Sequence, residues 1–125
     1  MPHRPTPSDL IEAVRQFLET RALPVLSGHT AFHARVAINA LSIVLRELDQ
    51  GAAHDAAEHD RLVKLLGQDA PLDDLRRMLA EQLGNGAMDV QSPDLIAHLK
   101  ASTMAHLSID NPKYAGYQRA LSKDR

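Results

Sequence analysis

The sequence predicts an all-α protein, and three observations support this class. Leucine and alanine each occur 18 times in 125 residues, whereas aromatic residues make up only 3% and tryptophan is absent. Leucine and alanine form helices well, while few aromatic and β-branched residues are available for a sheet. Apolar residues recur at intervals of three and four, and proline or glycine divides the chain into helix-sized segments. We therefore expect a compact bundle of five main helices with a short C-terminal helix or turn.

The first helix is expected to begin at the Thr6-Pro7-Ser8-Asp9 segment. Thr6 is a good N-cap, Pro7 suits the first helical position, and Asp9 carries negative charge at the positive end of the helix dipole. Pro24 is expected to end this helix near residues 21–23, because the residue before a proline avoids helical backbone angles. The apolar face consists of Leu10, Ile11, Val14, Phe17 and Leu18.

The second helix, residues 29–50, is expected to be the centre of the bundle. It contains no internal glycine or proline, and Gly51 follows as a typical stop residue. On a helical wheel of about 100° per residue, apolar side chains occupy most of the circumference. A surface helix has a narrower apolar face, so we expect other helices to pack around most of this one.

Three further helices are predicted after Gly51. The third runs through the alanine- and leucine-rich segment that ends at Gly67, and the fourth begins at Asp69-Ala70-Pro71 and ends at Gly84-Asn85-Gly86. The fifth begins at Ser92-Pro93-Asp94 and ends at the Ile109–Pro112 segment. We expect one domain over residues 1–125, with a flexible N-terminus at 1–6 and fraying over 118–125.

Composition argues against several classes of function. The net charge is −2, with 14 basic and 16 acidic residues, so no basic excess is available for nucleic acid. Cysteine is absent, which excludes disulfides and thiol chemistry. The N-terminus MPHRPTPSD lacks an apolar signal region, and no apolar run approaches the roughly 20 residues that span a membrane. We therefore expect a cytoplasmic protein that binds neither nucleic acid nor membrane.

The best candidate site is a polar stripe on the second helix, formed by Arg35, Asn39, Ser42 and Arg46. These residues fall within a sector only about 60° wide. As a ligand site, Arg35, Asn39 and Arg46 would bind an anion, since a guanidinium group pairs well with carboxylate or phosphate. The stripe is alternatively a solvated face. The third interpretation, which we favour, is a structural staple to Asp110, Asn111 and Tyr114.

The histidines and carboxylates predict neither a metal site nor a catalytic centre. His29 and His33 lie four residues apart, but no further ligand of suitable spacing accompanies them. His54, Glu58 and His59 are expected on a solvated helix face, and His98 and His106 at the border of an apolar face. Asp73 and Asp74 are explained by the helix dipole at the start of the fourth helix. We expect no catalytic residues, no metal and no cofactor.

Three stretches together resemble a known family: PTPSDLIEAVRQFLE, FHARVAINALSIVLRELD and IDNPKYAGYQRAL. Their most specific parts are HARVAINAL at 33–41 and DNPKYAGY at 110–117. The family comprises small bacterial all-helical domains of unknown function, often encoded beside, or named after, aminoglycoside-phosphotransferase-like kinases and acyl-CoA dehydrogenases. At 125 residues the chain lacks room for the flavin-binding architecture of those dehydrogenases, and it lacks the glycine-rich and catalytic loops of a kinase.

The resemblance implies an accessory role in acyl-CoA metabolism or beside such a kinase, without an established activity. The leading hypothesis is therefore a non-catalytic interaction domain whose partner is a kinase-like or acyl-CoA dehydrogenase-like protein. The alternative is a small binding protein or minor enzyme for an anionic acyl or phosphorylated metabolite. The sequence also permits a homodimer.

Overall fold

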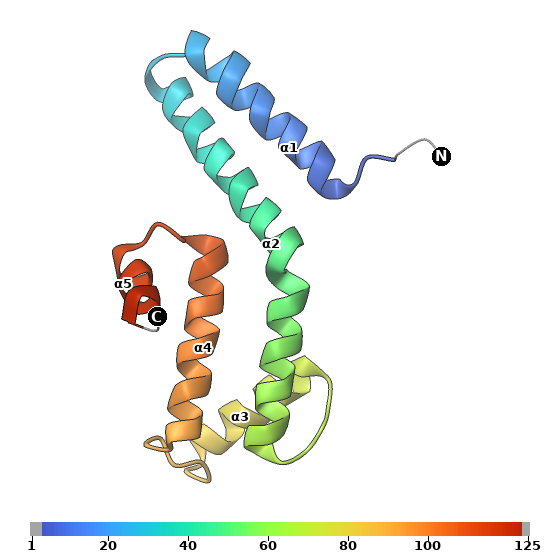
Figure 1. Cartoon of the computed structure of the whole chain (residues 1–125), viewed down its shortest axis with the longest axis vertical. Coiled ribbons are helices and arrows are strands. Elements are labelled where there is room, and N and C mark those ends of the chain that lie inside the picture. Colours follow the sequence, from blue (N-terminus) through green and yellow to red (C-terminus); the bar gives the residue numbers. More distant parts are fainter. Residues whose placement is uncertain (1–3, 124–125) are drawn as a thin grey trace. The chain divides into compact units, whose positions relative to one another are not determined.

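The computed structural model describes residues 4–123, and every regular element within this range is helical. The α-helices are α1 (Pro7–Phe17), α2 (Gly28–Leu66), α3 (Leu72–Gly84), α4 (Pro93–Asp110) and α5 (Ala115–Lys123) (Figure 1). The predicted all-α class is confirmed. The partition into helices differs, because the predicted second and third helices form the single helix α2. The short C-terminal element, predicted as a helix or a turn, is the helix α5.

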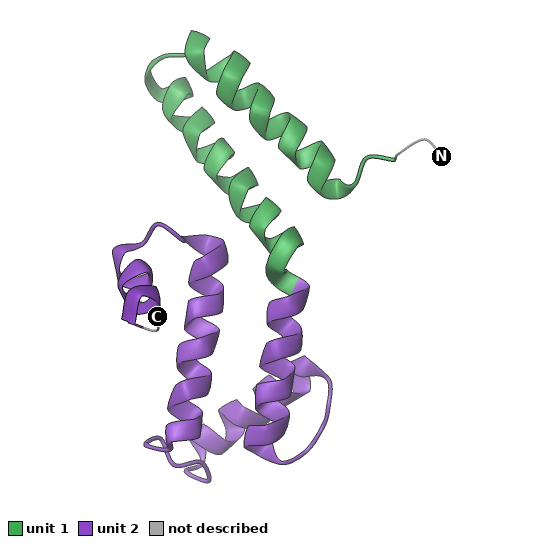
Figure 2. Cartoon of the chain, in the orientation of Figure 1, with its two compact units in different colours: residues 1–51 green, residues 52–125 purple. Residues whose placement is uncertain are grey.

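The chain forms two compact units, residues 1–51 and 52–125 (Figure 2). The first contains α1 and the first part of α2, which run antiparallel to each other (Figure 1). The second contains the rest of α2 together with α3, α4 and α5. The boundary falls inside α2, and the expectation of one domain over residues 1–125 stays a prediction.

Helix α1 begins as the sequence predicts but ends differently. The Thr6 backbone N–H donates to Asp9 Oδ2 at 2.9 Å, and the Asp9 N–H donates to Thr6 Oγ1 at 3.1 Å, which forms a capping box. Regular α-helix stops at Phe17, and the backbone continues as a π-helix over Leu18–Ala22 and a 3-10 turn over Leu23–Val25. Proline lacks an N–H, and its ring clashes with the carbonyl four residues earlier, so a wider turn is favoured before Pro24.

The prediction that Gly51 ends the second helix is wrong, because α2 continues to Leu66. A C′ glycine adopts a positive φ, and Gly51 is not among the glycines that do, whereas Gly67 has φ 74° and follows the observed end of α2. A glycine inside a helix costs about 1 kcal/mol relative to alanine. The alanine-rich segment after Gly51 favours helix strongly enough to overcome this cost.

The apolar core lies in the second unit, not around residues 29–50 as predicted. Its buried members are Leu62 of α2, Leu75 and Leu79 of α3, and Leu95 of α4. In the described part of the first unit, Ala31 is the only buried apolar side chain. The first part of α2 is therefore not enclosed on most of its circumference. Its exposed apolar side chains are Phe32, Val36, Val44 and Leu48.

The remaining helix boundaries follow local chemistry. The Ser92 hydroxyl accepts from the Leu95 N–H at the start of α4, and Pro93 occupies the first turn, as predicted. Before α5, the Gln118 side-chain amide donates to the Pro112 carbonyl at 2.6 Å. Helix α5 extends to Lys123, so residues 118–123 of the predicted frayed segment are helical. Residues 1–3 and 124–125, also predicted to be flexible or frayed, lie outside the described range.

Candidate functional site

The polar stripe predicted on the second helix is not equally accessible along its length. Arg35 and Asn39 are exposed, while Ser42 and Arg46 are half-buried. Ser42 donates from Oγ to the Ile38 carbonyl of its own helix at 3.0 Å, so its hydroxyl is satisfied locally. The stripe therefore divides into an exposed end and an end next to α1.

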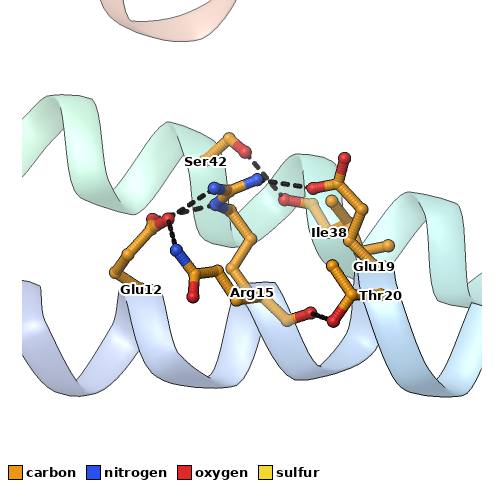
Figure 3. Close-up of polar contacts among 7 residues, drawn as sticks. Glu12, Arg15, Glu19, Thr20, Ile38 and Ser42 are labelled. Atoms are coloured by element: carbon orange, nitrogen blue, oxygen red, sulfur yellow. Dashed lines mark hydrogen bonds and ion pairs between the residues drawn. The ribbon is translucent and has the colours of Figure 1, made fainter.

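An ion-pair cluster on α1 lies next to the Ser42 turn (Figure 3). Arg15 donates to Glu12 through Nε at 2.9 Å and to Glu19 through Nη1 at 2.7 Å. The hydrogen bond from Arg15 is the largest cause that lowers the pKa of Glu12 below its ordinary value. Glu12 and Arg15 lie in α1 and Glu19 in the π-helix that follows it, so these contacts join successive turns and hold Arg15 toward α2 (Figure 3).

A hollow of about 410 Å³ surrounds Arg46 in the first unit. Its lining contains one arginine and three carboxylates, which does not favour an anion at this position. The lining residues are Ser8, Asp9, Glu12, Leu45, Arg46 and Asp49.

The predicted staple would join residues of the two units, so it stays a prediction. Asp110, Asn111 and Tyr114 are exposed. The Asn111 N–H donates to the Leu107 carbonyl at 2.9 Å, and the Tyr114 N–H donates to the Asn111 carbonyl at 3.1 Å. These turn groups are therefore satisfied within the second unit.

Exposed apolar side chains are concentrated in the first unit. Among the described residues, eight of the twelve exposed large apolar side chains belong to residues 10–48. We call the helical members of this set the hairpin apolar surface. It consists of Leu10, Val14 and Phe17 of α1 and Phe32, Val36, Val44 and Leu48 of α2.

The α1 part of this surface follows directly from helical geometry. Leu10, Val14 and Phe17 are spaced by four and three residues, so they form one continuous stripe. The half-buried residues of the helix lie on a different face. They are Ser8, Ile11, Glu12 and Arg15, and Leu18 of the following π-helix is half-buried as well.

A second polar cluster, in the second unit, was not predicted from the sequence. Arg61 of α2 donates from Nε to His98 Nδ1 at 3.2 Å and from Nη2 to Ser102 Oγ at 3.1 Å. His98 of α4 is only 5% exposed. Burial, followed by the neighbouring Arg61 charge, lowers the pKa of His98, while Glu58 opposes this shift. His98 is therefore held neutral, with its proton on Nε2 because Nδ1 accepts a hydrogen bond.

A hollow of about 300 Å³ adjoins this cluster, and we call it the Arg61 hollow. Its polar residues come from α2 and α4 of the same unit. A pattern signal for the cluster existed, because His98 and Ser102 follow the buried Leu95 by three and seven residues and so share its helix face. The lining residues are Arg61, Lys64, Leu65, Asp94, Ala97 and His98.

The face at residues 54–59, which was predicted to be solvated, is half-buried at His54, Glu58 and His59, and each of these side chains has a partner from another segment. His54 Nε2 lies 3.1 Å from Ser108 Oγ of α4. The Glu58 carboxylate accepts hydrogen bonds from Nε and Nη2 of Arg76 in α3, at 2.9 and 2.6 Å. The hydrogen bond from Arg76 lowers the pKa of Glu58. His59 Nε2 lies 2.9 Å from Asp69 Oδ1.

The described residues bear on two of the predicted absences, that of a metal site and that of a membrane-spanning helix. Within residues 4–123, no group of three histidine or acidic side chains is arranged to hold a metal ion. None of the helices described there combines the length and apolar character needed to cross a bilayer. His29 and His33 of α2 are both exposed, and the His33 ring packs edge-on against Phe32 at 5.5 Å between centroids.

The described helices thus define a small all-α protein with polar clusters in both units. A family model of a domain of unknown function, DUF6285, matches residues 24–114, and the chain belongs to this family. The match extends across the boundary between the two units. Searches of the curated proteins and of the solved structures gave no match.

Proposed function

We propose that this protein is a non-catalytic interaction domain that binds a larger enzyme through the hairpin apolar surface. The observation that carries the proposal is the exposure of both phenylalanines of the chain. Phe17 of α1 is 59% exposed and Phe32 of α2 is 57% exposed. Phenylalanine is usually buried, and aromatic side chains are enriched at the centres of protein interfaces.

Charge favours a protein as the occupant of this surface. Residues 1–51 contain five arginines, no lysine and five acidic residues, so the first unit carries no net formal charge. Anionic membranes and nucleic acids attract proteins through an excess of positive charge. An apolar surface without such an excess suits the apolar face of another protein.

The proposed partner is a bacterial, cytoplasmic enzyme that resembles either an acyl-CoA dehydrogenase or an aminoglycoside-phosphotransferase-like kinase. The resemblance of the HARVAINAL and DNPKYAGY segments to domains encoded beside such enzymes supports this choice. The protein would act as an accessory subunit, and the substrate chemistry would belong to the partner. Binding of an anionic metabolite at Arg35 and Arg46 is less favoured, because carboxylates dominate the hollow around Arg46.

Co-purification from the native host, followed by reconstitution with the purified partner, tests the proposal. A stoichiometric partner of one of the two enzyme classes is expected. The Phe17→Ser and Phe32→Ser variants should each weaken its binding by roughly 30-fold or more, because interface aromatics often contribute about 2 kcal/mol or more. Both side chains are exposed, so these variants should keep the wild-type circular dichroism spectrum and melting temperature.

Val90→Ser is the matched control, since Val90 is 66% exposed and lies in the second unit. This variant should bind the partner as wild type does. Equal losses for Val90→Ser and Phe17→Ser would place the interface elsewhere. If analytical ultracentrifugation detected only self-association through the hairpin apolar surface, the occupant of this surface would be a second copy of the chain and not an enzyme.

A further inference from the structure

We propose that the Arg61 hollow binds a small organic monocarboxylate, independently of the hairpin apolar surface. Three features of the hollow support this ligand class: an arginine that donates to neutral acceptors, a net charge of +1 on the lining residues, and apolar walls. None of the predicted site residues of the first unit contributes to it. The lining comes from α2 and α4 within the second unit.

Arg61 is fixed in position without a carboxylate partner. Its Nε and Nη2 atoms donate to His98 and Ser102, which are both neutral acceptors. In the part of the chain that the structure describes, no carboxylate lies within ion-pair distance of Arg61. The nearby Glu58 carboxylate is engaged by both Nε and Nη2 of Arg76. A half-buried guanidinium held in this way retains its charge and remains available to an anion.

The charge of the lining selects a monoanion. Arg61 and Lys64 contribute two positive charges, Asp94 contributes one negative charge, and His98 is neutral, so the lining carries a net charge of +1. A monocarboxylate matches this charge. A phosphate group carries about 1.5 to 2 negative charges near neutral pH, so part of its charge would stay unmatched in the half-buried hollow, where the cost of desolvating that charge opposes binding.

The size and the walls of the hollow fit a short carbon chain. A volume of about 300 Å³ lies at the lower end of ligand-binding pockets. Leu65 and Ala97 supply apolar surface next to the charged groups. In the proposed complex the carboxylate pairs with Arg61 and Lys64, while a short aliphatic body packs against Leu65 and Ala97.

Titration of the full-length, ¹⁵N-labelled protein with sodium butyrate tests this inference at constant ionic strength. Saturable chemical-shift changes are expected at Arg61, Lys64, Ala97 and His98. Inorganic phosphate and butylammonium serve as the comparison probes, and both should bind more weakly than butyrate. Tighter binding of phosphate would overturn the monocarboxylate assignment. Shifts that increase linearly with butyrate, without saturation at these residues, would overturn the site.

Three variants connect the binding to the charges of the hollow. Lys64→Gln should weaken butyrate binding roughly two- to fivefold, and Asp94→Asn should strengthen it by a similar factor, as expected for charges near the surface. Neither side chain contributes to the Arg61–His98–Ser102 hydrogen bonds, so the fold is retained. Arg77→Gln is the matched control, because Arg77 lies on α3 and pairs with Asp74 at 3.1 Å. Identical butyrate affinities in all four proteins would contradict the proposal.

Discussion

At the scale of single residues, two histidines of the second unit respond to pH in opposite directions. Burial and the Arg61 charge lower the pKa of His98 from its ordinary value of 6.5. Hydrogen bonds to Asp60 and then Asp69 raise the pKa of His59 from the same value. Protonation in acid therefore destabilises the folded state at His98 and stabilises it at His59.

We predict that His98 makes the protein less stable as the pH falls below about 6.5. At pH values between the lowered pKa of His98 in the folded state and its ordinary pKa in the unfolded chain, only the unfolded state binds the proton. Acidification therefore favours unfolding. Thermal melts of wild type and His98→Gln, from about pH 8 to about pH 5, measure this effect. The loss of stability on acidification should be smaller in the variant.

His59→Gln is the comparison variant for this pH experiment. The stability that His59 supplies is present below pH 6.5 and disappears as the pH rises through its raised pKa. Replacing His59 should therefore steepen the loss of stability on acidification, whereas replacing His98 should reduce it. If both variants changed the pH dependence in the same direction, the environment assigned to His98 would be incorrect.

At the scale of elements, α2 differs most from the sequence prediction, because one helix stands where two were expected. It spans Gly28–Leu66 without interruption, and Gly51 lies inside it. A Cβ atom added at Gly51 would meet Glu47 Oε1 at 2.5 Å and Glu47 Cδ at 2.9 Å. Both atoms belong to the far end of a flexible side chain, which can rotate away.

We predict that Gly51→Ala stabilises the protein by about 0.5–1 kcal/mol, since alanine is favoured over glycine within a helix. Urea unfolding monitored by circular dichroism measures the change. Gly67→Ala is the matched control and should be destabilising, because Gly67 has φ 74°, where a side chain is strained. If Gly51 were a helix stop, both alanine variants would be destabilising.

At the scale of the whole molecule, the two units differ in how much apolar surface they bury. The second contains the core of Leu62, Leu75, Leu79 and Leu95, while helix α1 of the first has no buried residue. Local stability depends on buried apolar contacts, so different parts of one chain open with different free energies. The family match over residues 24–114 includes both kinds of structure.

Hydrogen exchange followed by mass spectrometry should therefore reveal two levels of protection. Amides of α3 and of α2 near Leu62 should exchange more slowly than those of α1, because opening them disrupts the core. Binding of the proposed protein partner should slow exchange in α1 selectively. Uniform protection across α1 and α3 in the isolated protein would contradict this assignment of stability.

Some features of the fold could be predicted from local sequence. Thr6, Pro7, Asp9 and Ser92 define helix starts because capping depends on atoms only two or three residues apart. The beginnings of α1 and α4 were predicted for this reason, and the all-α class was predicted from composition and apolar periodicity. The helix break between α3 and α4 likewise follows from Gly84, Asn85 and Gly86.

The candidate sites were less predictable, because they depend on which helix faces meet. Apolar periodicity around residues 29–50 indicated burial, yet Phe32, Val36, Val44 and Leu48 of this segment are exposed. Apolar residues fit a protein core and a binding surface equally well, so their pattern does not distinguish the two. Arg61 and His98 are 37 residues apart in the sequence, and a separation of that length does not predict whether two side chains meet in space.

The sequence by itself determined the all-α class, most helix starts and the absence of thiol chemistry, since these follow from composition and short-range hydrogen bonding. The tertiary structure shows that α2 continues through Gly51, because the helix-forming segments on either side outweigh the local cost of the glycine. It alone placed the core at Leu62, Leu75, Leu79 and Leu95 and brought Arg61 to His98. Those contacts join segments far apart in the chain, and packing between helices, not local preference, selects them.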